Sequence, residues 1–154
     1  MKVWKSSKAP RARRAASLGA AGGLVLGLWA APALATSLAA TGLPEPLTAL
    51  AGDPAKGLGI AQGRDAQCAL CHVLPGSTVR QGNLGPGLQG VAQRLSPAML
   101  RLRLVDSRQI NPSTLMPAYH STQGLTQVGQ AWAGQTVLSA QDIEHVLAYL
   151  LTLD

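Results

Sequence analysis

The clearest hydrophobic pattern in the chain lies near its C-terminal end. There, apolar side chains recur at spacings of three and four residues, at Ile143, Val146, Leu147, Leu150 and Leu151. This spacing places them along one stripe of a helix. Ser139 and Asp142 precede the stripe in the arrangement of a capping box, with Asp in the less usual partner role. We therefore predict a helix that begins just after Ser139 and buries one face.

Two earlier segments carry another helix start, a capping side chain followed by proline. Asp53-Pro54 predicts a helix that runs to about Arg64, and Ser96-Pro97 predicts a helix over about 97–106. Proline suits the first helical position because its missing amide would be unpaired there in any case. The pattern therefore predicts three main helices, counting the one after Ser139.

Glycine and proline are frequent in the stretches between these helices, over 75–90, 111–119 and 124–134. No stretch of useful length alternates between apolar and polar residues, which is the pattern of a half-buried strand. The predicted class is all-α, with long irregular loops.

The first 35 residues have the pattern of a secretory signal. A basic start is followed by an apolar stretch from Leu18 to Trp29 and by small residues at Ala33 and Ala35. The alternative is a membrane anchor, but the apolar stretch is short for a bilayer crossing. We expect a cleaved signal over 1–35, an apolar, proline-broken N-terminal arm over 36–52 and a helical domain over 53–154.

Charge changes the picture once this segment is set aside. The chain has 13 Lys and Arg, 7 Asp and Glu, and a net charge of +6. Six of the basic residues and none of the acidic ones lie in the first 35 residues, so the remainder is formally neutral. Nucleic-acid binding needs a basic surface on the folded domain. We therefore expect no nucleic-acid partner, and no membrane contact after cleavage.

The candidate chemistry is concentrated in residues 68–72, whose sequence is Cys-Ala-Leu-Cys-His. Cys68, Cys71 and His72 match the attachment motif of a c-type haem. Each thiol can form a thioether with one haem vinyl group, and His72 can then bind the iron. The motif predicts one covalently attached haem c.

Other uses of a Cys-x-x-Cys pair fit the chain less well. A zinc site needs about four ligands, yet the chain has 2 Cys and 3 His and no second pair at zinc spacing. A thioredoxin-like redox pair is the other alternative. The adjacent His72 and the export signal favour haem over both.

A second axial ligand would close the iron to small molecules. The candidates are Met99, Met116, His120 and His145. Met99 lies in a predicted helix, where methionine usually fills the core, and His145 faces away from the apolar stripe of the last helix. Met116 lies in a proline-flanked loop that can present its thioether without deforming a helix. We predict Met116 as the second ligand, with His120 as its rival, and such a haem suits electron transfer.

The order of these parts resembles that of class I cytochromes c. A Gly85-Pro86-x-Leu88-x-Gly90 loop follows the attachment motif, and Met116-Pro117 and a terminal amphipathic helix come later. The resemblance implies a mono-haem domain with its helices wrapped round the haem. It also implies that the Pro86 carbonyl orients His72 and that Arg94 binds a haem propionate.

A closer resemblance is to SoxX, the small cytochrome subunit of the SoxAX complex. It covers roughly residues 57–153. Its motifs are Gly85-Pro86-Gly87-Leu88-Gln89-Gly90-Val91, Leu100-Arg101-x-Arg103-Leu104-Val105-Asp106 and, most specifically, Asn111-Pro112-Ser113-Thr114-Leu115-Met116-Pro117. SoxAX proteins join thiosulfate oxidatively to a cysteine of the carrier protein SoxY.

This resemblance implies a periplasmic, electron-accepting subunit rather than a catalytic one. Its partners would be a SoxA-like cytochrome in a heterodimer, SoxY through that complex, and a downstream acceptor such as another cytochrome c. Sulfur transfer needs a free nucleophilic sulfur or a comparable ligand. Because haem would occupy both cysteines of this chain, the sulfur chemistry is expected on SoxA.

Several alternatives stay open at this point. A free-standing periplasmic cytochrome c could serve another enzyme, and a haem with an open face could bind gases or peroxide. Trp132 is expected either against the haem or in the core. Arg101, Arg103 and Arg108 are expected to form a solvated helix face or, as the alternative, a docking face.

Overall fold

The computed structural model describes residues 38–154, and the expected signal over 1–35 lies outside them. The helices, in chain order, are α1 (Leu38–Thr41), α2 (Pro54–Gln62), η1 (Cys68–Leu70), α3 (Val91–Arg94), α4 (Pro97–Asp106), η2 (Ser107–Gln109), η3 (Gln130–Trp132) and α5 (Ala140–Leu150). The η elements are short 3-10 helices. No strand occurs between residues 38 and 154, so the predicted all-α class is confirmed. Within the same residues, none of the helices is both long and apolar enough for a membrane crossing.

The last helix, α5, begins as its sequence predicts. The Ser139 hydroxyl accepts a hydrogen bond from the Asp142 amide, and the Asp142 carboxylate accepts one from the Ser139 amide, both at 3.1 Å. Ile143, Val146 and Leu147 are fully buried. Leu151, expected on the same stripe, is the C-cap that follows the helix and is 39% exposed, whereas Leu150 and Leu153 on either side of it stay buried.

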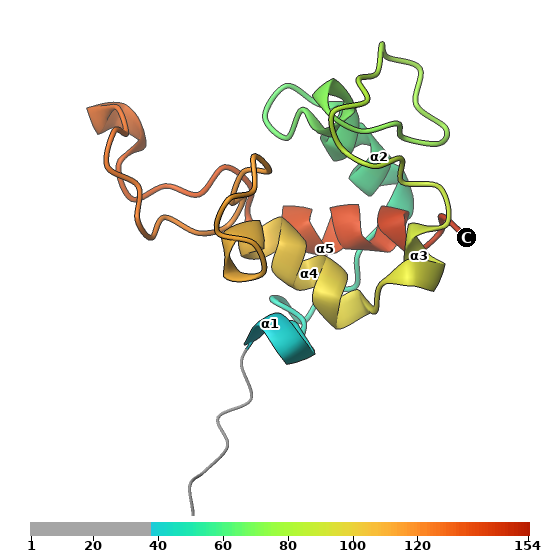
Figure 1. Ribbon diagram of the computed structural model, residues 1–154, viewed down its shortest axis with the longest axis horizontal. Helices are drawn as coiled ribbons and strands as arrows, with labels where there is room; N and C mark the ends of the chain where they lie inside the picture. The colour runs from blue at the N-terminus through green and yellow to red at the C-terminus, as the bar shows by residue number, and fades with distance from the viewer. Residues whose placement is uncertain (1–37) are drawn as a thin grey trace, which may run out of the picture. The chain divides into compact units, whose positions relative to one another are not determined.

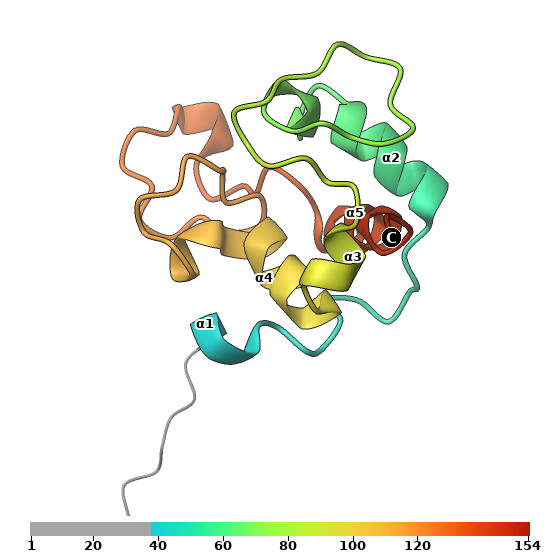
Figure 2. The ribbon, with the colours of Figure 1, turned by 45° about the vertical axis from the view of Figure 1, so that its right-hand side comes forward.

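Helix α2 packs along α5, so that an early and a late segment of the domain lie side by side (Figures 1 and 2). Asp53 caps α2 by accepting from the amides of Ala55 and Lys56. The close approach depends on Gly57, since a Cβ there would lie 2.6 Å from the His145 carbonyl carbon. The helix ends at Gln62, two residues before the expected end at Arg64, where Gly63 takes an extended conformation.

Helix α4 follows its prediction from Pro97 to Asp106, with the Ser96 hydroxyl accepting from the Met99 amide. It packs against α5, and Figure 1 shows the two helices side by side. Leu100 and Leu104 contribute to the hydrophobic core. The expectation that Arg101 belongs to a solvated or docking face is wrong, because Arg101 is only 6% exposed.

A buried ion pair holds α4 and α5 together. The Nε and Nη2 atoms of Arg101 donate to the two carboxylate oxygens of Glu144 at 2.8 and 3.1 Å. Burial alone would raise the pKa of Glu144, but hydrogen bonds from Arg101 and from the Leu47 amide, with the Arg101 charge, hold it below its usual range. A paired, hydrogen-bonded geometry is what a buried charge requires.

The arm is part of the same arrangement over its described residues, 38–52. Arg101 also donates to the carbonyls of Leu43 and Pro44, and Glu144 accepts from the Leu47 amide at 2.9 Å. The Asp53 amide donates to Nδ1 of His145 at 2.8 Å. The arm therefore lies against α4 and α5 of its own domain, and the Leu43 and Pro44 carbonyls and the Leu47 amide find their partners there.

The segment over 122–137 differs from this packed core. It loops away from α2 and α5 in both views, drawn in orange (Figures 1 and 2). Nearly all of its residues are exposed. Leu138 rejoins the core, where its amide donates to the Tyr119 carbonyl at 2.9 Å.

Candidate haem site

The attachment segment begins at a sharp turn after α2. Gln67 has φ of 48°, a left-handed conformation that non-glycine residues rarely adopt. It redirects the chain into η1, where the Cys68 carbonyl accepts from the amides of Cys71 at 3.2 Å and His72 at 2.9 Å. This single turn brings both thiols and the imidazole to one side of the chain.

His72 is oriented by the loop that follows it. Its Nδ1 atom lies 2.7 Å from the Pro86 carbonyl oxygen, so the ring can donate there and leave Nε2 free to act as a ligand. The Gly85 amide donates to the Cys71 carbonyl at 2.7 Å. A Cβ on Gly85 would lie 2.7 Å from Nδ1 of His72, so only glycine lets this loop pass the ring.

Met116 is presented by a loop built from short-range hydrogen bonds. Its amide donates to the Thr114 hydroxyl at 3.2 Å, and its carbonyl accepts from the Ser107 hydroxyl at 2.9 Å. The Thr114 amide in turn donates to the Asn111 carbonyl at 3.0 Å. Hydrogen bonds therefore hold both the amide and the carbonyl of Met116, while its side chain lines the cavity.

Tyr119 connects the two loops. Its hydroxyl donates to the Ala66 carbonyl at 2.8 Å, and its ring is 5% exposed. Burial raises the pKa of the Tyr119 hydroxyl far above its ordinary value, and the neighbouring Cys68 adds to the rise. Burial likewise raises the pKa of the Cys68 thiol, although a hydrogen bond with Tyr119 partly offsets it. Tyr119 thus stays neutral and fastens the methionine loop to the attachment segment.

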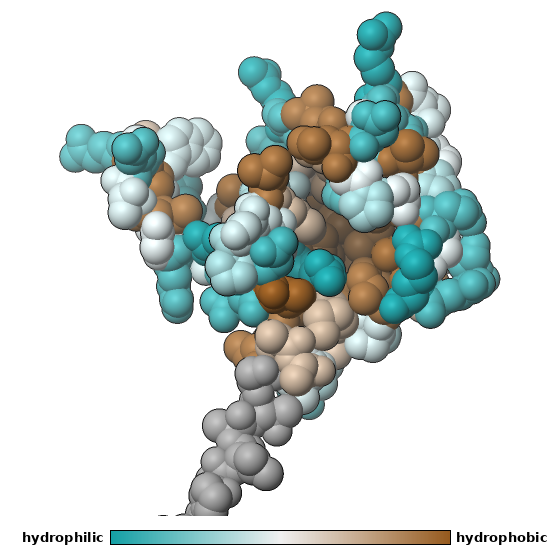
Figure 3. All heavy atoms as spheres, in the orientation of Figure 1, coloured by the Kyte–Doolittle hydropathy of each residue, from teal (hydrophilic) through white to brown (hydrophobic). Residues whose placement is uncertain are grey.

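These segments surround one cavity of about 840 Å³. Figure 3 shows it as a recess of brown, apolar atoms bordered by polar ones. The six predicted site residues all line it: Cys68, Cys71, His72, Pro86, Arg94 and Met116. Helices α4 and α5 add apolar side chains that the sequence reasoning did not assign to the site, namely Leu100, Leu104, Val146 and Leu150.

The residues present fit a covalently attached haem. Both cysteines are free thiols at the cavity wall. The volume lies within the range of about 300–1,000 Å³ typical of cofactor and ligand sites. The lining is mainly apolar around a few polar groups, as a flat macrocycle with two carboxylates requires. Zinc is a poor match, because residues 38–154 hold no group of three His, Cys, Asp or Glu that could bind a metal ion.

The other candidates for the second ligand lie away from this cavity. Neither His120 nor Met99 lines it. Nδ1 of His120 is hydrogen-bonded to the Leu138 carbonyl at 2.8 Å, and His145 accepts from the start of α2. Of the four candidates, the cavity therefore receives Met116 alone.

Arg94 lies on the cavity with its guanidinium partly committed elsewhere. It donates to the carbonyls of Gln89 and of Gly87, the latter at 3.0 Å. These bonds brace the loop that carries Pro86. Arg94 retains further N–H groups, since a guanidinium has five.

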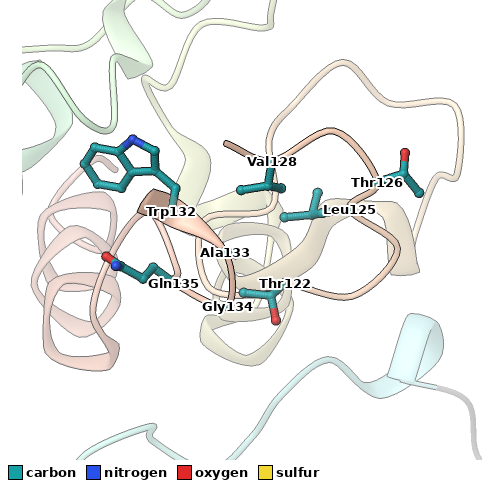
Figure 4. Close-up of a pocket in the computed structure, with 8 residues that line it drawn as sticks. All are labelled: Thr122, Leu125, Thr126, Val128, Trp132, Ala133, Gly134 and Gln135. Atoms are coloured by element: carbon teal, nitrogen blue, oxygen red, sulfur yellow. The ribbon is translucent and has the colours of Figure 1, made fainter. Parts of the chain in front are cut away.

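A second, smaller hollow of about 220 Å³ lies in the outlying segment. Figure 4 shows its lining residues, which include Leu125, Val128 and Trp132 and no titratable side chain. Trp132 is 68% exposed. Both expectations for Trp132 are therefore wrong, because its segment leaves the core before this residue is reached. The hollow offers no group that could carry catalysis or bind a metal.

Comparisons with known proteins agree with this site. The cytochrome c family model matches residues 57–154. A chain of the crystal structure of SoxXA from P. pantotrophus matches with a TM-score of 0.66 and 28% sequence identity, over 73% of this chain and 90% of that chain. No curated protein matches. The resemblance to SoxX drawn from the motifs is thus confirmed, and the class I cytochrome c fold with it. The chain belongs to the cytochrome c family, and its cofactor is haem c attached through a Cys-x-x-Cys-His motif.

Proposed function

We propose that this chain is the periplasmic, electron-accepting cytochrome subunit of a SoxAX-type complex that oxidatively couples thiosulfate to the SoxY cysteine. The observation that carries the proposal is the convergence of both thiols, His72 and Met116 on one apolar cavity. The likeness to the SoxXA structure supports a SoxA-like partner.

The proposed roles follow from position. Cys68 and Cys71 would form the two thioethers, and His72 and Met116 would bind the iron. The Pro86 carbonyl fixes the ring of His72, and Arg94 contributes to binding a propionate. A bound haem c supplies one-electron redox chemistry, whose potential a methionine ligand raises relative to a second histidine.

The available cysteines indicate which subunit carries the electrons and which one carries the sulfur chemistry. Joining thiosulfate to a SoxY thiol breaks the thiol S–H bond, forms one sulfur–sulfur bond and releases one proton and two electrons. This chain has 2 cysteines, and both are assigned to haem, so none remains as a nucleophile. Because one haem holds one extra electron, the chain accepts the two electrons one at a time and passes each to a downstream acceptor, and the sulfur chemistry takes place on the partner.

Reduction of the haem by thiosulfate tests the function. The purified holoprotein is mixed with thiosulfate, a candidate SoxA and SoxY, and its visible spectrum is followed. Reduction with all components, absent when SoxA or SoxY is omitted, supports the proposal. Indifference to both proteins would favour a free-standing electron shuttle instead.

The distal ligand is tested by spectroscopy. The oxidised protein should show a near-infrared sulfur-to-iron band that disappears in Met116→Ala. Met99→Ala is the matched control, because Met99 does not line the cavity and its variant should keep the band. Retention of the band in Met116→Ala, or its loss in Met99→Ala, contradicts the assignment.

Export is tested separately. The haem-containing protein recovered from the periplasm should begin at Thr36, as measured by intact mass. A protein that keeps residues 1–35 in the membrane fraction would contradict cleavage.

A further inference from the structure

We propose that Arg103 is the principal cationic anchor for a haem propionate. Leu100, Arg103 and Leu104 line the cavity from α4. Their spacing of three and four residues places them on one face of the helix. Two apolar side chains of α4 therefore line the cavity, and a guanidinium lies between them in sequence. The inference depends on the haem and not on the proposed partner.

The guanidinium of Arg103 lacks a protein partner. Its Nε atom is buried, and no hydrogen bond reaches it from residues 38–154. The ion pairs of this part of the chain are Arg101 with Glu144 and Arg108 with Asp106. Asp65, an acidic residue that also lines the cavity, forms no such pair with Arg103. A buried donor left without an acceptor is costly, so this group calls for an acceptor from the cavity.

The neighbouring arginines show what a satisfied guanidinium looks like here. Arg101 binds Glu144 and two backbone carbonyls, and Arg94 binds the carbonyls of Gln89 and Gly87. Of these three arginines, only Arg103 makes no hydrogen bond through its guanidinium N–H groups within the described chain. A carboxylate matches that fork of N–H groups, since arginine binds carboxylates through two parallel hydrogen bonds. The haem brings two carboxylates into this cavity.

The test removes the charge and follows the propionate. An opposite charge nearby lowers the pKa of a carboxyl by about 1–3 units. In Arg103→Leu the propionate pKa should therefore rise by about that amount. The measurement is the reduction potential against pH, where the inflection due to the propionate should move to higher pH. The propionate bending band in the resonance Raman spectrum should shift as well.

Matched variants separate this role from general effects. Arg80→Leu removes the same charge from an exposed residue off the cavity and should leave both readouts unchanged. Arg94→Gln tests the residue that the family resemblance indicates, and it should shift the Raman band less than Arg103→Leu. Arg103→Lys keeps a charge but not the fork, so the inflection should stay near its wild-type pH while the Raman band shifts.

Two results would overturn the proposal. In one, Arg103→Leu behaves as wild type, which would mean that no propionate contacts Arg103. In the other, Arg94→Gln gives the larger shift. If Arg103→Leu fails to accumulate with haem, Arg103→Lys decides by itself, since an unchanged Raman band in that variant also contradicts the anchor.

Discussion

Helix α4 carries two arginines, two residues apart, on opposite sides. Arg101 faces α5 and the arm, where a carboxylate and two carbonyls of the chain satisfy it. Arg103 faces the haem cavity and finds no acceptor in the described chain. On the Arg101 side, the polypeptide supplies every partner that the guanidinium uses. On the Arg103 side, we expect the cofactor to supply the missing acceptor. The difference indicates which parts of this fold depend on haem, because a buried donor without an acceptor and an unfilled apolar cavity both oppose folding.

The largest effect should come from preventing attachment. Cys68→Ala with Cys71→Ala removes both thioethers, so no haem mass should remain on the denatured protein. Without covalent haem the cavity side of α4 lacks its partner, and the folded fraction should fall sharply. Intact mass and circular dichroism measure the two effects. Thr78→Ala, at an exposed loop position, is the control and should keep both haem and fold. Normal helicity in the double variant without bound haem would contradict the comparison.

The next largest effect on stability should come from the Arg101 side of α4, where the ion pair with Glu144 lies. Arg101→Met leaves Glu144 buried without its cation, which should lower the free energy of unfolding by about 3–5 kcal/mol. Urea unfolding of the haem-loaded protein measures it. The matched control is Arg101→Met with Glu144→Leu, which should recover part of the loss because no buried charge remains. Equal stability of the single variant and the wild type would show that the pair is not what holds α4, α5 and the arm together.

Acid should weaken this side in a definite direction. The pKa of folded Glu144 lies below its unfolded value. The contribution of Glu144 is therefore complete above the ordinary glutamate range and is lost as the pH falls through the folded pKa. Glu144→Gln cannot titrate, so the stability gap between wild type and variant should narrow on acidification. The measurement is the urea midpoint from pH 7 to pH 3. A stability difference between wild type and Glu144→Gln that stays constant with pH would contradict a lowered pKa of Glu144 in the folded protein.

The smallest effect should come from the outlying segment, which belongs to neither side of α4. Trp132 is 68% exposed, so Trp132→Ala should change the free energy of unfolding by no more than about 0.5 kcal/mol. Its potential and haem content should match those of wild type. A large loss of stability would show that this segment packs more tightly than its exposure indicates.

Much of the fold could be predicted because its signals are local. The Ser96-Pro97 and Ser139 starts depend on neighbouring residues, and both helices begin where these caps place them. The same holds for the attachment motif, whose residues lie on one turn. Helices α1 and α3 and the 3-10 helices lie outside the predicted elements, since such short elements carry no useful period. Arg101 was placed wrongly because its partner, Glu144, is remote in sequence.

Local patterns in the sequence predict the three main helices, the class of protein and the pair of thiols, because caps, hydrophobic period and a five-residue motif act over short distances. The packing of distant segments selects the side chains that share the cavity with those thiols. The packing places Met116 at the cavity and directs His120 to the Leu138 carbonyl. It also pairs Arg101 with Glu144 but leaves Arg103 at the cavity without a partner in the described chain. Those outcomes depend on which residues of distant segments meet when α2, α4 and α5 pack together, and no local pattern encodes that meeting.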